Sequence, residues 1–238
     1  MLTMQLGTTD TKRMVSGHTV RRILQYVLVL AALLILATII LQNYNYVFNA
    51  EFPLAAGRQK RIPKLSGGPC KEKKCPEDHF SFFIQTGAAN VVPPKICVEN
   101  KLILGSVTNN AGGGINIVLV NGKTGEVTRT GAFNMYSDDV QGLIDFLKTI
   151  EEGSAVLMAT YDEPATKLND EAKKLIGELG SSSIQSLAYR DSWLFVGAKG
   201  DGTKSRFEKH IKNEAEKNKY DGWPEVINLD GCIPKYME

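Results

Sequence analysis

Residues 115–130, with the sequence INIVLVNGKTGEVTRT, predict a β-hairpin in the middle of the chain. The first strand, residues 115–120, is rich in β-branched side chains, which favour strands. Residues 121–125 combine Asn and Gly as hairpin turns do, and the return strand is expected over residues 126–130. The glycines at 112–114 open a strand rather than a helix, so they do not match a phosphate-binding loop. They are interpreted as allowing a tight or bulged entry to the strand.

Further strands and helices are predicted on both sides of this hairpin. Residues 155–161, AVLMATY, have no polar side chain before Thr160, which is typical of a central strand buried on both faces. Apolar side chains at helical spacing predict one helix that starts at residues 137–139 and a second over residues 166–179, ended by Gly180. The capping-box pattern of residues 205–208 predicts a short third helix. Shorter strands are expected at residues 79–85, 96–98, 102–104, 193–196 and 226–229.

The composition of the 238 residues is that of a folded protein with little net charge. Hydrophobic residues make up 43% and charged residues 23%, which excludes a mainly disordered chain. The 28 Lys and Arg residues nearly balance the 26 Asp and Glu residues. Because nucleic-acid binding needs a clear basic excess, no nucleic-acid partner is expected.

One apolar segment, residues 23–41, carries no charge and is close to the roughly 20 residues that cross a bilayer. Basic residues precede it, which predicts a cytosolic segment at 1–22 and a lumenal or extracellular remainder. An uncleaved signal-anchor is favoured, and a cleaved signal peptide is the alternative. Residues 42–69 are expected to form a flexible basic stalk, residues 70–234 the globular domain and residues 235–238 a tail.

All four cysteines follow the apolar segment, at positions 70, 75, 97 and 232. An even number of cysteines in an oxidising compartment predicts two disulfides, whose pairing the sequence leaves open among three possibilities. Zinc is the rival interpretation, but His79 is the only histidine near enough to serve as a ligand. No metal and no cofactor are therefore expected.

Catalytic motifs are missing from the sequence. There is no HExxH and no Gly-x-Ser-x-Gly pattern. His79 and His210 do not fall in a recognisable base motif, and no serine or threonine is marked as a nucleophile. The sequence therefore predicts a protein that is not an enzyme and has no catalytic residue.

A possible ligand site is formed by polar residues at the ends of two predicted strands. Asp162 follows the central strand, and Arg190 and Trp193 lie at the start of another. A carboxylate accepts from hydroxyl groups, a guanidinium donates in a fixed fork, and an aromatic face takes the apolar side of a sugar ring. The spacing alone favours a different interpretation, in which an Arg–Asp pair locks a loop and Trp193 lies in the core.

Several short motifs in the domain resemble the interleukin-like epithelial–mesenchymal transition inducer family, which also includes pancreatic-derived factor. The resemblance extends from about Cys70 to Pro234. The motifs that carry it are SFF at 81–83, GAANVV at 87–92, PKIC at 94–97, GIN at 114–116, NGKTGEV at 121–127, YDEPATK at 161–167, RDSW at 190–193 and YDGWPE at 220–225.

This resemblance implies a ββα fold of the α/β class, with two mainly antiparallel sheets packed together and flanked by two to three helices. It implies disulfides Cys70–Cys97 and Cys75–Cys232. In related GG-type lectin domains, an acid and an arginine at the positions of Asp162 and Arg190 contact carbohydrate. The resemblance thus favours these two residues as a carbohydrate-binding site, with Trp193 beside them as a support or platform.

The resemblance also implies a secreted, cytokine-like protein, or one tethered to the membrane by its N-terminal segment. The expected partners are a cell-surface receptor, a glycan or both, and the alternative is a Golgi-resident glycan-binding module without cytokine activity. Val196 stands where the family's inducer member carries an extra cysteine, so a monomer or weak dimer is expected. Asp191 is expected to point away from Arg190, because side chains alternate in an extended segment.

Overall fold

The computed structural model describes residues 17–50, 70–200 and 202–235, and the chain divides into two units, Met1–Ile62 and Pro63–Glu238. Helix α1 (Gly17–Ala50) forms the described part of the first unit. It covers the apolar segment at 23–41 and continues through residues 42–50, which the sequence placed in the stalk. Within the described ranges, no helix combines the length and the apolar character needed to cross a membrane. Residues 1–16, 51–69 and 236–238 of the predicted N-terminal segment, stalk and tail lie outside the described residues.

The second unit contains a four-stranded and a five-stranded antiparallel sheet. The order of the first sheet is β3-β2-β1-β9, and that of the second is β5-β4-β6-β7-β8. The strands of the first sheet are β1 (His79–Gln85), β2 (Lys95–Val98), β3 (Lys101–Leu104) and β9 (Asn228–Pro234). Those of the second are β4 (Gly114–Asn121), β5 (Val127–Phe133), β6 (Ser154–Tyr161), β7 (Ser192–Ala198) and β8 (Phe207–Ile211).

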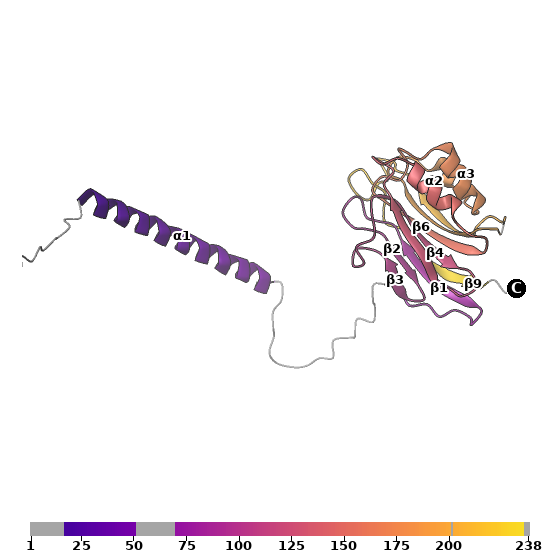
Figure 1. The fold of residues 1–238 in the computed structure, drawn as a ribbon, viewed down its shortest axis with the longest axis horizontal. Coiled ribbons are helices and arrows are strands. Elements are labelled where there is room, and N and C mark those ends of the chain that lie inside the picture. The colour runs from indigo at the N-terminus through magenta and orange to yellow at the C-terminus, as the bar shows by residue number, and fades with distance from the viewer. Residues whose placement is uncertain (1–16, 51–69, 201, 236–238) are drawn as a thin grey trace, which may run out of the picture. The chain divides into compact units, whose positions relative to one another are not determined.

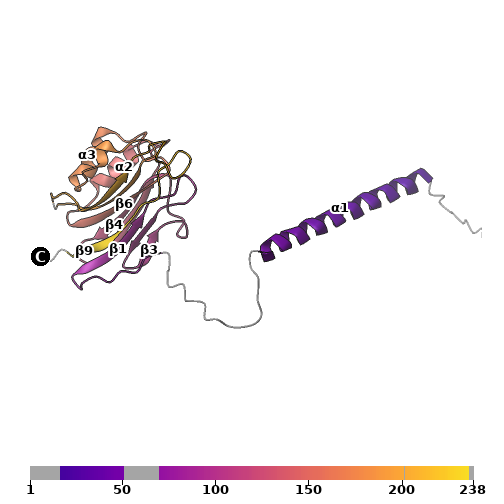
Figure 2. The same cartoon turned by 180° about the vertical axis from the view of Figure 1, so that it is seen from behind.

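Helices cover only one face of this sandwich. The helices α2 (Gln141–Lys148) and α3 (Asp170–Glu178) lie on the face of the five-stranded sheet that points away from the four-stranded sheet (Figure 1). A short 3-10 helix, η1 (Ile184–Ser186), follows α3. The view from behind shows the same three layers (Figure 2). The expected ββα arrangement of two antiparallel sheets flanked by helices is confirmed.

The core has two large parts and a small cluster around the Cys70–Cys97 disulfide, and the two large parts explain the apolar sequence of the middle strands. Met158 of β6 packs in the cluster under the helices, and its neighbour Leu157 packs in the cluster between the sheets. Strand β6 is the middle strand of its sheet and is buried on both faces, as its sequence predicts. Every residue of the two large clusters belongs to the second unit, so this unit has its own hydrophobic core, as domains that fold alone do.

Both expected disulfides are present. Cys70 pairs with Cys97 and Cys75 pairs with Cys232, over sequence separations of 27 and 157 residues. The second bond joins the segment before β1 to the last strand, which itself pairs with β1. The two ends of the domain are therefore held by a covalent bond as well as by a strand ladder.

The predicted third helix at residues 205–208 is wrong, because this segment leads into strand β8. Ser205 Oγ accepts from Phe207 N and donates to the Val196 carbonyl, so it does not cap a helix. Phe207 and Ile211 pack against the cluster between the sheets, whereas Glu208 binds Trp193 on the other side of the strand. Pairing of β8 with β7 satisfies the backbone here, and the side chains alternate with the period of a strand.

Other predicted boundaries also move, including those of α2, α3 and β9. Helix α2 begins at Gln141 instead of residues 137–139, where Asn134 Oδ1 accepts from two backbone N–H groups of a turn. Helix α3 begins at Asp170, after the N-cap Asn169 accepts from Ala172 N. Strand β9 begins later than predicted and extends through Cys232. At both helices an asparagine side chain satisfies the backbone before the helix starts.

Candidate functional site

A small hollow lies at the loop end of the five-stranded sheet, where β6 ends and β7 begins. Its volume is about 10 Å³, close to that of one water molecule, and both Asp162 and Arg190 line it. The other lining residues are Gly87, Ala89, Thr160, Tyr161, Asp191, Ser192 and Trp223. The structure therefore brings together the two polar residues that the sequence separates by a helix and several turns.

The backbone at both polar residues is left-handed, with φ of 58° at Asp162 and 60° at Arg190. This conformation costs energy in residues other than glycine, and such residues concentrate at functional sites. A hydrogen bond from Asp162 N to the Ala89 carbonyl holds one of them. The turn at Arg190 is closed by a hydrogen bond from Asp191 N to the Ala188 carbonyl. The fold thus maintains two strained residues on one hollow.

Two aromatic rings hold the Arg190 guanidinium. Its Cζ lies 3.9 Å from the centroid of the Trp223 ring and 4.9 Å from that of Tyr189. Gly222 makes this approach possible, because a Cβ atom there would lie 2.7 Å from Arg190 Nη1. Gly222 also has a φ of +81°, which a larger residue would adopt at a cost. Stacking on two rings fixes the guanidinium without neutralising it.

Two buried nitrogen donors at this site have no hydrogen-bond partner among the described residues. They are Arg190 Nε and Trp223 Nε1. A buried donor without an acceptor is expensive, about 1–3 kcal/mol, and such atoms are rare in native structures. Both atoms are enclosed by the protein, so they add to the strain of the hollow, and a ligand would reach them only if the stacked side chains moved.

Asp191 also lines the hollow, and its carboxylate fixes the loop that carries Arg190. Its carboxylate accepts from the backbone N–H groups of Ala188 and Asn213 and lies 2.7 Å from His210 Nε2. Burial acts to raise the pKa of Asp191, but these hydrogen bonds outweigh it and hold the pKa below the ordinary value. The loop lock considered from the sequence thus exists, with His210 as the partner of Asp191 and Arg190 left for the hollow.

Trp193 is not a platform for a ligand, because its side chain is completely buried. Its ring stacks on Phe195 at 5.6 Å under the helices, and its Nε1 donates to Glu208 at 2.9 Å. Its backbone N donates to Thr160 Oγ1, so Trp193 supports the floor of the hollow from below. The tryptophan at the hollow is Trp223, which the sequence marked only as part of a family motif.

Tyr161 connects the hollow to the loop after β1. Its hydroxyl donates to the Asn90 carbonyl at 2.8 Å. Burial, together with the charge of Asp162, raises the pKa of Tyr161. Among the described residues, no group of three or more His, Cys, Asp or Glu side chains is placed to hold a metal ion.

Comparison with known proteins identifies the family. The chain is 62% identical to the protein FAM3C of Danio rerio over 162 residues, which cover 68% of this chain and 71% of that protein. The chain belongs to the FAM3 family of interleukin-like EMT inducers. It is 54% identical to human FAM3C over 183 residues, covering 77% of this chain and 80% of the relative. With human FAM3A it shares 52% identity over 161 residues, covering 68% and 70%.

The family model for interleukin-like EMT inducers matches residues 113–201. This range contains Asp162 and Arg190 but ends before Trp223. The resemblance seen in the short motifs is confirmed, and the family model is described as an interleukin-like EMT inducer.

Proposed function

We propose that this FAM3 protein is a cytokine-like signalling protein whose ββα domain binds a glycan at the hollow of Asp162 and Arg190. The observation that carries the proposal is that Asp162 and Arg190, both held in a left-handed backbone conformation, line one hollow with Trp223. The carboxylate of Asp162 has no side-chain partner among the described residues.

A sugar complements this combination of groups. Adjacent hydroxyls donate to the Asp162 carboxylate, and an acetamido carbonyl accepts from the Arg190 guanidinium. An N-acetylhexosamine carries both adjacent hydroxyls and an acetamido group. Hydrogen bonds to charged groups contribute about 1.5–3 kcal/mol each. Because the hollow is shallow, we expect binding of order millimolar, or about −4 kcal/mol.

We further propose that the domain folds in the secretory pathway and is released to act on a cell-surface receptor. Two disulfides support an oxidising compartment, and membership of the FAM3 family supports signalling. Mass spectrometry of conditioned medium should find the chain and read its N-terminus. A chain that is absent from the medium and retained in the Golgi would favour the alternative of a resident glycan-binding module.

Glycan binding is tested with residues 63–238 and N-acetylglucosamine, followed by calorimetry or NMR. Arg190→Ala and Asp162→Asn should each abolish binding and leave the melting temperature nearly unchanged. Arg129→Ala is the matched control, because Arg129 also stacks on an aromatic ring, that of Phe146, but does not line the hollow. This variant should bind as the unaltered domain does.

Two results would count against the proposal. If the Arg190 and Asp162 variants lose several degrees of melting temperature and the unaltered domain does not bind, the two residues have only a structural role. If both variants are stable and still bind, the glycan site lies elsewhere on the domain.

A further inference from the structure

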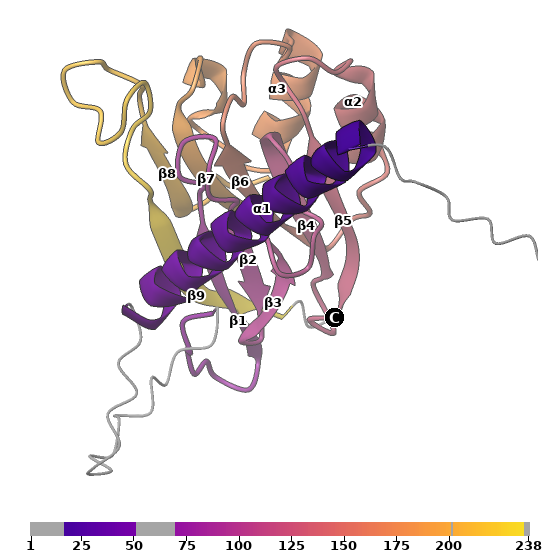
Figure 3. The ribbon, with the colours of Figure 1, turned by 90° about the vertical axis from the view of Figure 1, so that its left-hand side faces the viewer.

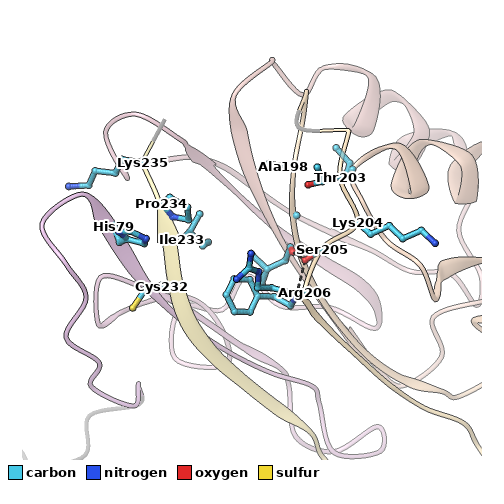
Figure 4. Close-up of a pocket in the computed structure, with 14 residues that line it drawn as sticks. His79, Ala198, Thr203, Lys204, Ser205, Arg206, Cys232, Ile233, Pro234 and Lys235 are labelled. Carbon is cyan, nitrogen blue, oxygen red and sulfur yellow. Dashed lines mark hydrogen bonds between the residues drawn. The ribbon is translucent and has the colours of Figure 1, made fainter. Parts of the chain in front are cut away.

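A second, larger cleft lies on another part of the domain, at the open edge of the sandwich. Strands β8 and β9 are the end strands of their sheets and run along the same side of the domain (Figure 3). They come together where Phe207 packs near Gly231 and Phe82. From there they separate toward Ser205 and Pro234, which line the cleft (Figure 4).

The size and walls of the cleft suit a small amphipathic molecule. Its volume of about 560 Å³ lies within the range of roughly 300–1,000 Å³ that is usual for small-molecule sites. Val196 and Leu179 form part of the apolar wall, and each is 3% exposed. Ile233 and Pro234 lie across the cleft from Ser205 and Arg206 (Figure 4). The apolar part is therefore built into the core rather than formed by mobile surface side chains.

The ionisable residues that line the cleft are all basic in type. They are His79, Lys204, Arg206 and Lys235, and no Asp or Glu side chain lines it among the residues that the structure describes. His79 already contacts Asp78, and Lys235 Nζ donates to the Glu77 carbonyl. Lys204 and Arg206 are exposed and have no acidic partner among the described residues. The cleft therefore combines apolar walls with two cations that are free to pair with an anion.

We propose that this cleft binds the carboxylate and the alkyl chain of a single-chain fatty acid. The chain would bury against Val196 and Ile233, where each methylene removed from water is favourable. The carboxylate would pair with Arg206, whose fork of donors matches a carboxylate, and with Lys204. A polyanion such as a sulfated glycan would leave the apolar walls unused, and a neutral apolar molecule would leave the cations unpaired.

The test uses residues 63–238 and dodecanoate below its micelle concentration, with binding followed by NMR and calorimetry. Amide signals of Val196 and Ile233 should shift on addition of dodecanoate. Dodecanoate should bind at least tenfold more tightly than butyrate, which lacks the long chain, and than dodecyltrimethylammonium, whose charge is reversed. The double variant Lys204→Glu, Arg206→Glu should lower the affinity for dodecanoate at least tenfold.

Lys212→Glu is the matched control, since Lys212 is exposed and does not line the cleft. It should bind dodecanoate as the unaltered domain does. Three results would each overturn the proposal. Dodecyltrimethylammonium could bind as tightly as dodecanoate, the double variant could bind dodecanoate as tightly as the unaltered domain, or the NMR shifts could map outside the cleft. Binding of a heparin tetrasaccharide at these residues in the absence of any binding by dodecanoate would overturn it as well. The mapping on the unaltered domain decides the question even if the double variant fails to fold.

Discussion

Removing the two disulfides separately should destabilise the domain by different amounts. In the loop-entropy model, the stabilisation increases with the length of chain that the bond closes. The separation of 157 residues for Cys75–Cys232 corresponds to about 5 kcal/mol, and that of 27 residues for Cys70–Cys97 to about 3.5 kcal/mol. Each value changes little when the other disulfide is intact. The path between one pair of cysteines that runs through the other disulfide still contains about 140 residues, by the same counting.

The assay is urea unfolding of residues 63–238 and of the two double-alanine variants, Cys75→Ala with Cys232→Ala and Cys70→Ala with Cys97→Ala. Alanine avoids burying a hydroxyl at Cys70 and Cys97, which are 4% and 1% exposed. The variant without Cys75–Cys232 should be the less stable by about 1.5 kcal/mol. An equal loss, or a larger loss for the Cys70–Cys97 variant, would refute the argument that loop length governs the difference.

Three further changes test the groups around the hollow. The folded-state pKa of Asp191 is lowered, so the stability that its carboxylate contributes is present above its unfolded pKa of about 3.9 and is lost as the pH falls through the folded value. The difference in urea stability between the unaltered domain and Asp191→Asn should therefore shrink as the pH falls below about 4. Trp193→Phe removes the bond to Glu208 and part of a buried ring, so it should cost about 2 kcal/mol in thermal or urea unfolding while glycan binding is retained. Gly222→Ala places a Cβ against Arg190 Nη1 and should weaken glycan binding in calorimetry, whereas Gly142→Ala, where a Cβ meets nothing within 4 Å, should not. Loss of binding in Gly142→Ala or Trp193→Phe would contradict the assigned geometry.

Much of the fold follows from local patterns in the sequence. The hairpin around residues 121–125 and the buried strand β6 are marked by turn residues and by side chains that are apolar on both faces. The sequence did not predict strand β8, because Ser205 and Glu208 have the spacing of a capping box. Their conformation is decided by pairing with β7. That contact is made between residues distant in the sequence, so a local pattern does not reveal it. The membrane assignment of residues 23–41 stays a prediction.

The candidate site is less visible in the sequence than the fold. Asp162 and Arg190 were marked by their places at strand ends and by the family resemblance. Which of two neighbouring charges faces the hollow depends on the left-handed backbone at Arg190 and on the contact of Asp191 with His210. The choice between Trp193 and Trp223 depends on burial, which only the packed domain determines.

The most direct test of the glycan site uses the two tryptophans of the chain as opposing reporters. Trp223 Nε1 is a buried donor without a partner at the hollow, whereas Trp193 Nε1 is bound to Glu208. In a nitrogen-15 NMR titration of residues 63–238 with N-acetylglucosamine, the indole signal of Trp223 should move with a millimolar midpoint and that of Trp193 should stay fixed. Movement of the Trp193 signal alone, or of neither signal at saturating sugar, would contradict a glycan site at Asp162 and Arg190.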